Sequence, residues 1–278
     1  MSTMKNTKPL IMFSWDGKLP LMPCVLKDAE PFFDILLFDY SGVAAIPESF
    51  SINGVFPEFL SLSTECKGDI FQALIDHLER SNNSPEYIGL IDDDILISIA
   101  DINRALHLAK ARNLDIFSPV LTHDSSYSHS WMLQQPHRAV RDVLWVEVMM
   151  PFYKREIILA AKPFVKGYSS SWGFDAYVFP LIQKMLGMNR CGLIDAVAAS
   201  HFRPVSSHGK VFKNGLNAFE EAAKIKESCK EYIRKHHADW LTTDWFDRIY
   251  VRKRVYTRWQ QHLYQLGKPI KRWLEKSA

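Results

Sequence analysis

Three consecutive aspartates, Asp92, Asp93 and Asp94, directly follow the apolar run YIGLI at residues 87–91. Burial of an unpaired carboxylate is costly, so charges in this position indicate a polar site at the end of a buried strand. In an extended chain, residues two apart point to the same side, and Asp92 and Asp94 are therefore expected to converge. Hard oxygen ligands of this kind suit Mg²⁺, Mn²⁺ or Ca²⁺. The pattern predicts a metal site, and a solvated turn is its structural alternative.

Three later residues are further candidates for this chemistry. Asp175, in WGFD, precedes a helical run and can act as a base or as a helix cap. His201, in ASHFRP, ends a segment with strand character and can bind a metal, although a single histidine more often has a structural role. Glu147 lies in WVEVMMP, which we interpret as an interior strand, and a buried glutamate there is either paired or catalytic.

The elements around these residues predict an α/β domain. Strand-like apolar runs alternate with segments of helical periodicity, which is typical of a largely parallel sheet flanked by helices. The strands are expected at 9–15, 33–40, 87–91, 114–121, 143–153 and from 191, and the first helices at 66–81 and 100–113. In open sheets of this type, ligands bind beyond the carboxyl ends of the strands, which is where the three aspartates fall.

Composition and length fit an ordinary globular protein. The chain has 278 residues, of which 47% are hydrophobic and 23% charged, and its net charge of +3 says little about partners. The four cysteines form no CxxC pair, so neither a disulfide framework nor a zinc knuckle is indicated. The N-terminus lacks a long apolar run, and no later run is long enough to span a bilayer. We expect a cytoplasmic protein.

The sequence pattern changes near residue 210, beyond which the chain is helical and charged in character and contains no further strand candidates. We predict a catalytic domain at 1–210 and a helical extension at 211–278, whose end alternates basic and aromatic residues. This tail is either a solvated helical cap, a nucleic-acid surface or a contact with anionic lipid headgroups. It contains no recognisable nucleic-acid module, so we favour a peripheral contact with the inner face of the cytoplasmic membrane over a nucleic-acid surface and expect no nucleic-acid partner, while the solvated helical cap stays open.

Several segments, taken in order, resemble a known family. It is a plant and bacterial domain of unknown function, whose plant members carry the label "lysine-ketoglutarate reductase trans-splicing related". The resemblance rests on DILLFDYSG (34–42), YIGLIDDDI (87–95), LDIFSPVL (114–121), WVEVMMPFYKRE (145–156), SWGFDAYV (171–178) and GLIDAVAASHFRP (192–204). The family's acidic motif reads WDEDL, and this chain keeps only its outer two aspartates, as Asp92 and Asp94. No RNA-binding signature supports the trans-splicing label.

The architecture of that family looks like the GT-A fold of nucleotide-sugar glycosyltransferases. The resemblance implies that Asp92 and Asp94 hold a metal and the nucleotide, with Asp93 in support and His201 as a third metal ligand. It also implies that Asp175 is the catalytic base.

The same resemblance suggests roles for three more residues. Glu147 is the second choice for the base. Asp39, at the end of the run 33–40, would contact the base or ribose of the nucleotide, unless it is simply a turn residue. Lys67, before a helix, would reach the diphosphate, unless it is simply solvated.

The function that follows is glycosyl transfer from a nucleotide-sugar donor to a saccharide or lipid-linked saccharide acceptor. It would depend on Mn²⁺ or Mg²⁺, would serve bacterial surface polysaccharide synthesis, and would invert the anomeric configuration. Two other classes stay open. One is a metal-dependent phosphoesterase or nucleotidyltransferase, and the other is a non-catalytic carbohydrate-binding module.

Overall fold

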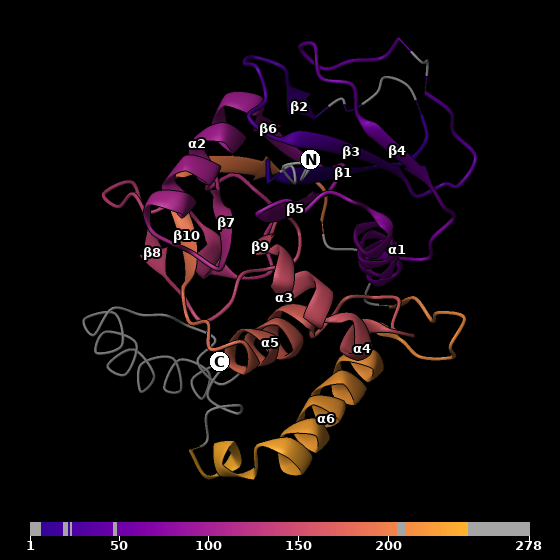
Figure 1. Cartoon of the computed structure of the whole chain (residues 1–278), viewed down its shortest axis with the longest axis vertical. Helices are drawn as coiled ribbons and strands as arrows, with labels where there is room; N and C mark the ends of the chain where they lie inside the picture. Colours follow the sequence, from indigo (N-terminus) through magenta and orange to yellow (C-terminus); the bar gives the residue numbers. More distant parts are fainter. Residues whose placement is uncertain (1–6, 19–21, 23, 47–48, 205–208, 244–278) are drawn as a thin grey trace, which may run out of the picture.

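A computed structural model describes residues 7–18, 22, 24–46, 49–204 and 209–243 (Figure 1). Its strands form one sheet. They are β1 (Leu10–Trp15), β2 (Val25–Leu26), β3 (Asp34–Asp39), β4 (Glu58–Ser61), β5 (Tyr87–Ile91), β6 (Ile95–Ser98), β7 (Ile116–Leu121), β8 (Arg141–Asp142), β9 (Phe152–Lys154) and β10 (Cys191–His201). The order is β2-β6-β10-β7-β9-β5-β1-β3-β4, with β8 also paired to β10.

Parallel pairing dominates the centre of the sheet. β1 lies between β3 and β5 and runs parallel to both, and β7 runs parallel to β10. β9 is inserted between β5 and β7 and is antiparallel to each. Because β1, β3 and β5 are parallel, their carboxyl ends meet at one edge of the sheet, where residues 39–40 and 92–93 come together. The predicted α/β architecture is confirmed.

The helices gather around this sheet. They are α1 (Lys67–Arg80), α2 (Ile99–Ala111), α3 (Arg155–Ala160), α4 (Lys162–Val165), a π-helical turn η2 (Phe174–Val178), α5 (Phe179–Met185) and α6 (Ala218–His236), with 3-10 turns η1 (Ser130–Met132) and η4 (Ala238–Thr243). α2 lies beside β7 and β10, whereas α3 to α6 gather in the lower half of Figure 1. The strands predicted at 9–15, 33–40, 87–91 and 114–121 and both predicted helices are confirmed.

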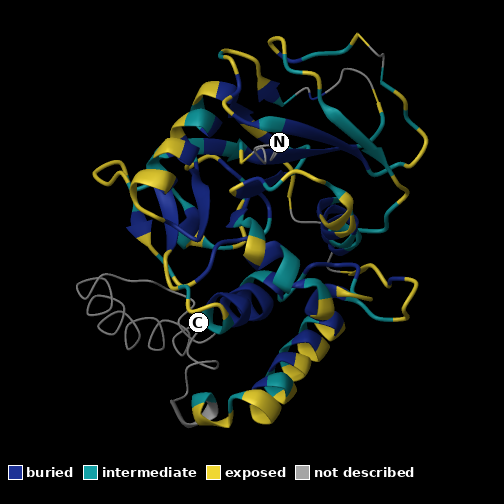
Figure 2. Cartoon of the chain, in the orientation of Figure 1, coloured by how far each residue is buried: buried dark blue, intermediate teal, exposed yellow. Residues whose placement is uncertain are grey.

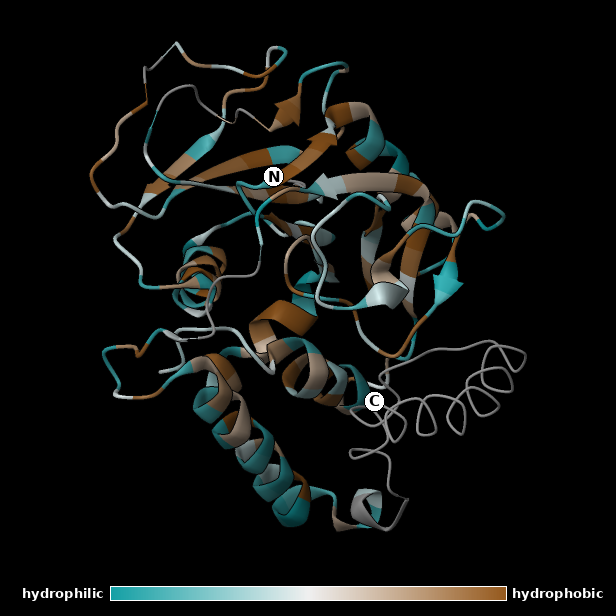
Figure 3. Ribbon diagram, turned by 180° about the vertical axis from the view of Figure 1, so that it is seen from behind, coloured by the Kyte–Doolittle hydropathy of each residue, from teal (hydrophilic) through white to brown (hydrophobic). Residues whose placement is uncertain are grey.

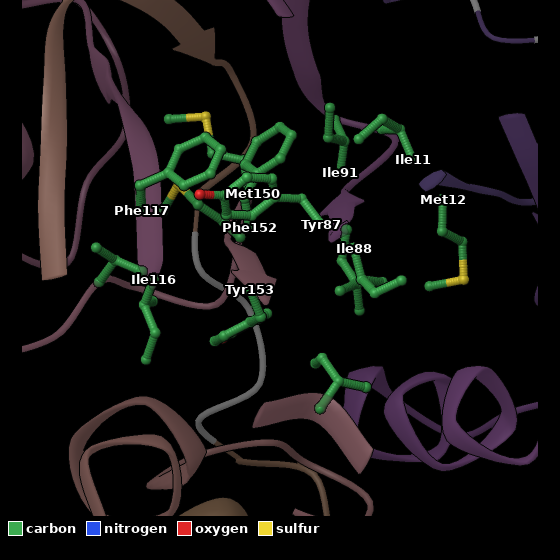
Figure 4. Packing of buried hydrophobic residues seen from close by; sticks show 14 of the residues in the cluster. Ile11, Met12, Tyr87, Ile88, Ile91, Ile116, Phe117, Met150, Phe152 and Tyr153 are labelled. Atoms are coloured by element: carbon green, nitrogen blue, oxygen red, sulfur yellow. The ribbon is translucent and has the colours of Figure 1, made fainter. Parts of the chain in front are cut away.

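The core is built where β9 joins β5 and β7. Phe117 and Phe152 stack with ring centroids 4.7 Å apart, and Tyr87 meets Phe117 edge-on (Figure 4). A Cβ on Gly89 would lie within 2.8 Å of Phe152 ring carbons, so a glycine in β5 makes room for that ring. Seen from behind, the central strands are strongly apolar while the outer face of α6 is polar (Figure 3).

The strand predicted at 143–153 is wrong over most of its length. Only Phe152–Lys154 joins the sheet, as β9. Residues 143–151 form an irregular loop that passes the end of β5, where Leu90 donates its backbone N–H to the carbonyl of Pro151. Pro151 has no N–H to give to a ladder, which is one physical reason why the strand begins only after it. Glu147 therefore lies on a loop and not on an interior strand.

Beyond residue 210, the helix α6 packs onto the rest of the protein. Ile225, Cys229 and Ile233 are spaced four residues apart and are buried, while the opposite face is exposed (Figure 2). Asn217 and Glu220 form a capping box at the start of the helix. The domain boundary near 210 stays a prediction, and the basic, aromatic tail lies outside the described residues. None of the described helices combines the length and the apolar composition that a membrane-spanning helix requires.

Candidate functional site

The three aspartates lie in a tight turn between β5 and β6, here called the aspartate turn (residues 92–94). The backbone N–H of Ile95 bonds to the carbonyl of Asp92 over 3.2 Å, which closes the turn. The chain is therefore not extended at this point, so the expected strand alternation between Asp92 and Asp94 is wrong, although the charge of Asp94 still acts on Asp92. Instead, each aspartate meets a different positively charged or ionisable side chain.

Asp92 is paired with Lys67, the first residue of α1. The ammonium Nζ lies 2.5 Å from Asp92 Oδ1 and 3.2 Å from the carbonyl oxygen of Met149. Burial raises the pKa of the Asp92 carboxyl to about 6, although Lys67 acts to lower it. Lys67, which the sequence resemblance predicts to reach a diphosphate, therefore contacts the aspartate turn.

Asp93 is held by two residues that the sequence motifs contain but do not single out. The Tyr40 hydroxyl donates to Asp93 Oδ2 over 2.8 Å, and the Arg203 guanidinium lies 3.2 Å from both carboxylate oxygens. Burial raises the pKa of Tyr40, and its hydrogen bond to Asp93 raises it further. Sequence reasoning missed both partners, although each lies inside a motif, DILLFDYSG for Tyr40 and ASHFRP for Arg203.

Asp94 faces His201 because of the register between β6 and β10. His201 lies opposite Ile95 in that antiparallel pairing, and its Nε2 is 3.4 Å from Asp94 Oδ2. The other ring nitrogen, Nδ1, lies 2.7 Å from the carbonyl oxygen of Ser126. A carbonyl only accepts, so Nδ1 carries the proton, and in the neutral ring the lone pair of Nε2 points toward Asp94.

The pairing shifts the pKa of both groups. Burial raises the pKa of Asp94, but the hydrogen bond and charge of His201 outweigh burial, and the net shift is downward. Burial lowers the pKa of His201, whereas Asp94 and the Ser126 carbonyl raise it, and the net shift is upward. The Asp94 carboxylate therefore favours the protonated form of His201, and protonated His201 favours the ionised form of Asp94.

Asp39 ends β3 at the same edge but is fully engaged by its own neighbours. Oδ1 accepts from the backbone and hydroxyl of Ser41, and Oδ2 accepts from Ala44 N–H and the Ser61 hydroxyl, all within 2.8 Å. Burial raises the pKa of this carboxyl, but the four hydrogen bonds dominate and lower it to about 2. This geometry favours the turn interpretation of Asp39, and its contact with a nucleotide stays a prediction.

The donor atoms near the aspartate turn meet part of what a divalent cation needs. Within the described ranges, no group of three or more His, Cys, Asp or Glu residues is placed to hold a metal. Magnesium-type sites often use only one or two protein ligands and take the rest from phosphates and water. Two neighbouring ligand atoms on such an ion stand about 3 Å apart, close to the 3.4 Å between Asp94 Oδ2 and His201 Nε2. The spacing of these two atoms therefore matches two neighbouring positions on such an ion.

A second cluster surrounds a cavity of about 420 Å³ next to the loop at 143–151. The cavity contains the carboxylates of Glu147 and Asp175, and its walls are mainly aromatic and small apolar side chains. It is lined by Ser128, His129, Trp145, Glu147, Val148, Trp172, Gly173, Asp175, Ala176, Tyr177, Phe219, Ala222, Ala223 and Lys226. The helix α6 supplies four of these residues, so it forms one wall of the cavity.

The two carboxylates of this cavity interact electrostatically. Burial raises the pKa of Asp175 to about 7, and the nearby charge of Glu147 adds to the effect. Burial likewise raises the pKa of Glu147 to about 6, against the lowering effects of Ser128, His201 and Lys67. Lys67, His201 and Asp92 all act on the pKa of Glu147, and Glu147 in turn raises the pKa of Asp175. Glu147 therefore links the aspartate turn to the cavity electrostatically.

The loop that carries Trp172 and Asp175 is fixed by Glu221 from α6. The buried Glu221 carboxylate accepts hydrogen bonds from the backbone N–H groups of Ser169 and Ser170, over 2.9 and 2.7 Å. Gly173 follows with a φ of +90°, and a Cβ there would come within 3.1 Å of the Tyr177 ring. The glycine of WGFD is therefore needed where the chain turns into η2.

The chain resembles proteins of known structure in its fold. No protein-family model and no curated protein matches the chain. Solved structures of S. aureus TarS are similar to it. TarS 1–349 gives a TM-score of 0.56 at 10% identity, over 90% of this chain and 71% of that one. TarS 1–349 in complex with UDP-GlcNAc gives 0.54 at 11% identity, over 83% and 66%. A longer TarS gives 0.55 at 9% identity, over 92% and 45%.

These likenesses show the fold, because the sequence identities are too low to carry more. The expected GT-A-like arrangement, a largely parallel sheet flanked by helices, is confirmed. The chain spans about two thirds of TarS 1–349 and less than half of the longer TarS. The family suggested by the sequence motifs is matched by no family model and stays a prediction.

Proposed function

We propose that the protein is a glycosyltransferase that moves a sugar from a nucleotide-sugar donor to a saccharide or glycolipid acceptor, with Mn²⁺ or Mg²⁺. One observation carries the proposal: the pair Asp94 and His201 lies at the edge of a GT-A-like sheet and is linked electrostatically, through Glu147, to a cavity that contains two carboxylates. The likeness in fold to TarS, which has been crystallised with UDP-GlcNAc, supports the choice of a nucleotide sugar as donor.

On the donor side, Asp94 and His201 would hold the cation. When bound, such an ion stabilises negative charge on a departing diphosphate as a Lewis acid. The Ser126 carbonyl keeps one proton of His201 on Nδ1, so the cation would take the place of a proton on Nε2. Lys67, at the start of α1, brings a positive charge to the same turn.

On the acceptor side, Asp175 would take the proton of the attacking hydroxyl. A carboxyl with a pKa of about 7 both holds and releases a proton near neutral pH, which suits a general base. Glu147 is the second choice for this role. Direct attack by an acceptor that Asp175 deprotonates displaces the nucleotide in one step, so we favour inversion of the anomeric configuration.

Calorimetric titration tests the donor half of the proposal. The full chain would be titrated with UDP, GDP, ADP and CMP, with and without Mn²⁺, followed by a screen of nucleotide sugars for hydrolysis or transfer. Mn²⁺-dependent binding of one nucleoside diphosphate is expected. If no nucleotide binds under any metal condition, the protein is not a glycosyltransferase of this kind.

We extend the proposal to the location of the protein, which would be cytoplasmic with a peripheral contact at the membrane. This part rests on the basic and aromatic sequence after residue 243. Flotation with liposomes that contain anionic lipid, comparing the full chain with a chain that ends at residue 243, tests it. Equal flotation of the two chains would contradict it.

A further inference from the structure

The cavity beside Glu147 has walls suited to a ring-shaped ligand with apolar faces. Trp145 and Trp172 line it, together with Phe219 from α6 and the ring of Tyr177. Trp172 and Phe219 meet edge-on, with ring centroids 4.9 Å apart. Small residues, Ala222 and Ala223, complete the wall formed by α6. Binding sites of this form bury the apolar surface of a ligand against aromatic rings and orient it with a few polar groups.

One buried polar atom of the cavity has no partner among the residues that the structure describes. Glu147 is only 9% exposed, and its Oε2 makes no hydrogen bond to them. Buried polar atoms are nearly always hydrogen-bonded, so this oxygen is expected to accept a hydrogen bond from something that enters the cavity. A carboxylate oxygen accepts most strongly from a hydroxyl or N–H group.

The charges of the cavity favour an uncharged ligand. Two carboxylates, Glu147 and Asp175, belong to its described lining, together with the ammonium group of Lys226, which lies 5.6 Å from the centre of the Tyr177 ring. His129 and Ser128 add further polar side chains. With both carboxylates ionised, the described lining carries two negative charges against the one positive charge of Lys226, so a carboxylate or phosphate on the ligand would meet a net negative charge in a partly desolvated space, which costs binding free energy.

We propose that this cavity is the acceptor subsite and that it takes a neutral, hydroxyl-bearing sugar ring, in preference to an acidic one. Glu147 Oε2 accepts a hydrogen bond from a ring hydroxyl, and Trp145, Trp172 and Phe219 cover the apolar faces of the ring. The assignment of the ligand as an acceptor rests on the glycosyltransferase function proposed above.

Saturation-transfer NMR on the full chain tests the subsite without any turnover. The probes are methyl glucoside and methyl galactoside, each beside its matched uronic acid, and N-acetylglucosamine. At least one neutral glycoside is expected to bind, and its uronic acid to bind at least tenfold more weakly. Calorimetry with UDP and Mn²⁺ is run on the same protein preparations.

Three variants sharpen the test. Glu147→Gln should weaken the neutral glycoside about tenfold and reduce the discrimination against the uronic acid, because it removes both a charged acceptor and a repulsive charge. Phe219→Ala, on the exposed side of α6, should weaken the neutral glycoside without affecting the fold. Phe56→Ala removes an exposed aromatic side chain that does not line the cavity, and should change nothing.

The outcomes separate the two proposals. If UDP fails to bind while a neutral glycoside binds and responds to the variants, the donor assignment fails and the subsite stands. If UDP binds but no neutral glycoside does, or if the uronic acid binds as well as the neutral sugar, the subsite proposal is overturned. It is also overturned if Glu147→Gln is folded by circular dichroism and binds the glycosides like the wild type.

Discussion

His201 Nε2 lies 3.4 Å from Asp94 Oδ2 because β6 and β10 pair with His201 directly opposite Ile95. The two residues are more than one hundred positions apart in sequence, and the antiparallel ladder between β6 and β10, next to the edge strand β2, brings them together. The position of His201 relative to Asp94 therefore depends on this register. A shift of one residue would turn the His201 side chain to the other face of the sheet and separate the two proposed metal ligands.

Asp94→Asn should abolish most of the Mn²⁺-dependent affinity for the nucleotide. The amide is a weaker ligand for a hard cation and removes the negative charge opposite His201. We expect at least a tenfold loss in the calorimetric affinity for UDP in the presence of Mn²⁺, with an unchanged far-UV spectrum. Asp142→Asn, the same change at an exposed position of β8, is the matched control and should bind like the wild type. Retention of full Mn²⁺-dependent binding by Asp94→Asn would rule out its role as a ligand.

Asp175→Asn should lower transfer and leave donor binding intact. Removal of a general base typically costs about 10² to 10⁴ in rate. The expected result is a fall of this size in kcat, with an unchanged affinity for the nucleotide. Glu147→Gln should reduce kcat less than Asp175→Asn does. If the order of the two effects were reversed, Glu147 would be the base.

The activity should rise with pH, with its midpoint at about pH 7, and level off about one pH unit higher. Burial, reinforced by Glu147, raises the pKa of Asp175 to about 7, and only the ionised carboxylate accepts a proton. Below that pH the protonated fraction grows and kcat/KM falls. A pH profile of kcat/KM measured from pH 5 to 9 checks this. A flat profile across pH 6 to 8 would speak against Asp175 as the titrating base.

The raised pKa of Asp175 also predicts that ionisation of this residue destabilises the folded protein. A carboxyl whose pKa is raised in the folded state binds its proton more tightly there than in the unfolded chain, so the free energy of unfolding falls as pH rises between about 4 and about 7. Asp175→Asn removes this titration. Its melting temperature, relative to that of the wild type, should therefore be higher at pH 8 than at pH 4. An identical difference at both pH values would show that the shift is absent.

Glu221→Gln should loosen the loop that carries Trp172 and Asp175. Glu221 accepts from two backbone N–H groups through different oxygens, and the amide of glutamine can offer only one acceptor. A buried donor without its acceptor costs roughly 1 to 3 kcal/mol, which urea denaturation would measure. Glu227→Gln, in an exposed ion pair with Arg234 on the same helix, should cost less than about 1 kcal/mol. Equal costs for the two changes would contradict the role of Glu221.

The local sequence pattern predicted most strands and helices, but it did not predict which side chains contact one another in the candidate site. Apolar periodicity located β1, β3, β5, β7, α1 and α2, since burial of one face dictates these elements. It failed at Glu147, where an apolar run reads as a strand although the chain forms a loop before Pro151. A local pattern does not distinguish apolar residues buried in a ladder from those buried in a loop.

The contacts of the aspartate turn could not be predicted for a different reason. Tyr40 and Arg203 meet Asp93 only because β1, β3 and β5 are aligned and β10 returns to β6. Such pairings depend on the register of strands distant in sequence, which residue types do not encode locally. The role of Asp39 illustrates the same limit, because only the folded loop shows that its four hydrogen bonds are already made.

The aspartate turn carries its own counter-charges. Lys67 and Arg203 stand against Asp92 and Asp93, and His201, when it is protonated, stands against Asp94, so repulsion among the aspartates is offset by the chain itself. Chelators should consequently leave the melting temperature of the ligand-free protein unchanged. If the protein binds a cation as proposed, we expect the ion to enter together with a diphosphate, because the combined species brings little net charge to an edge that is already balanced.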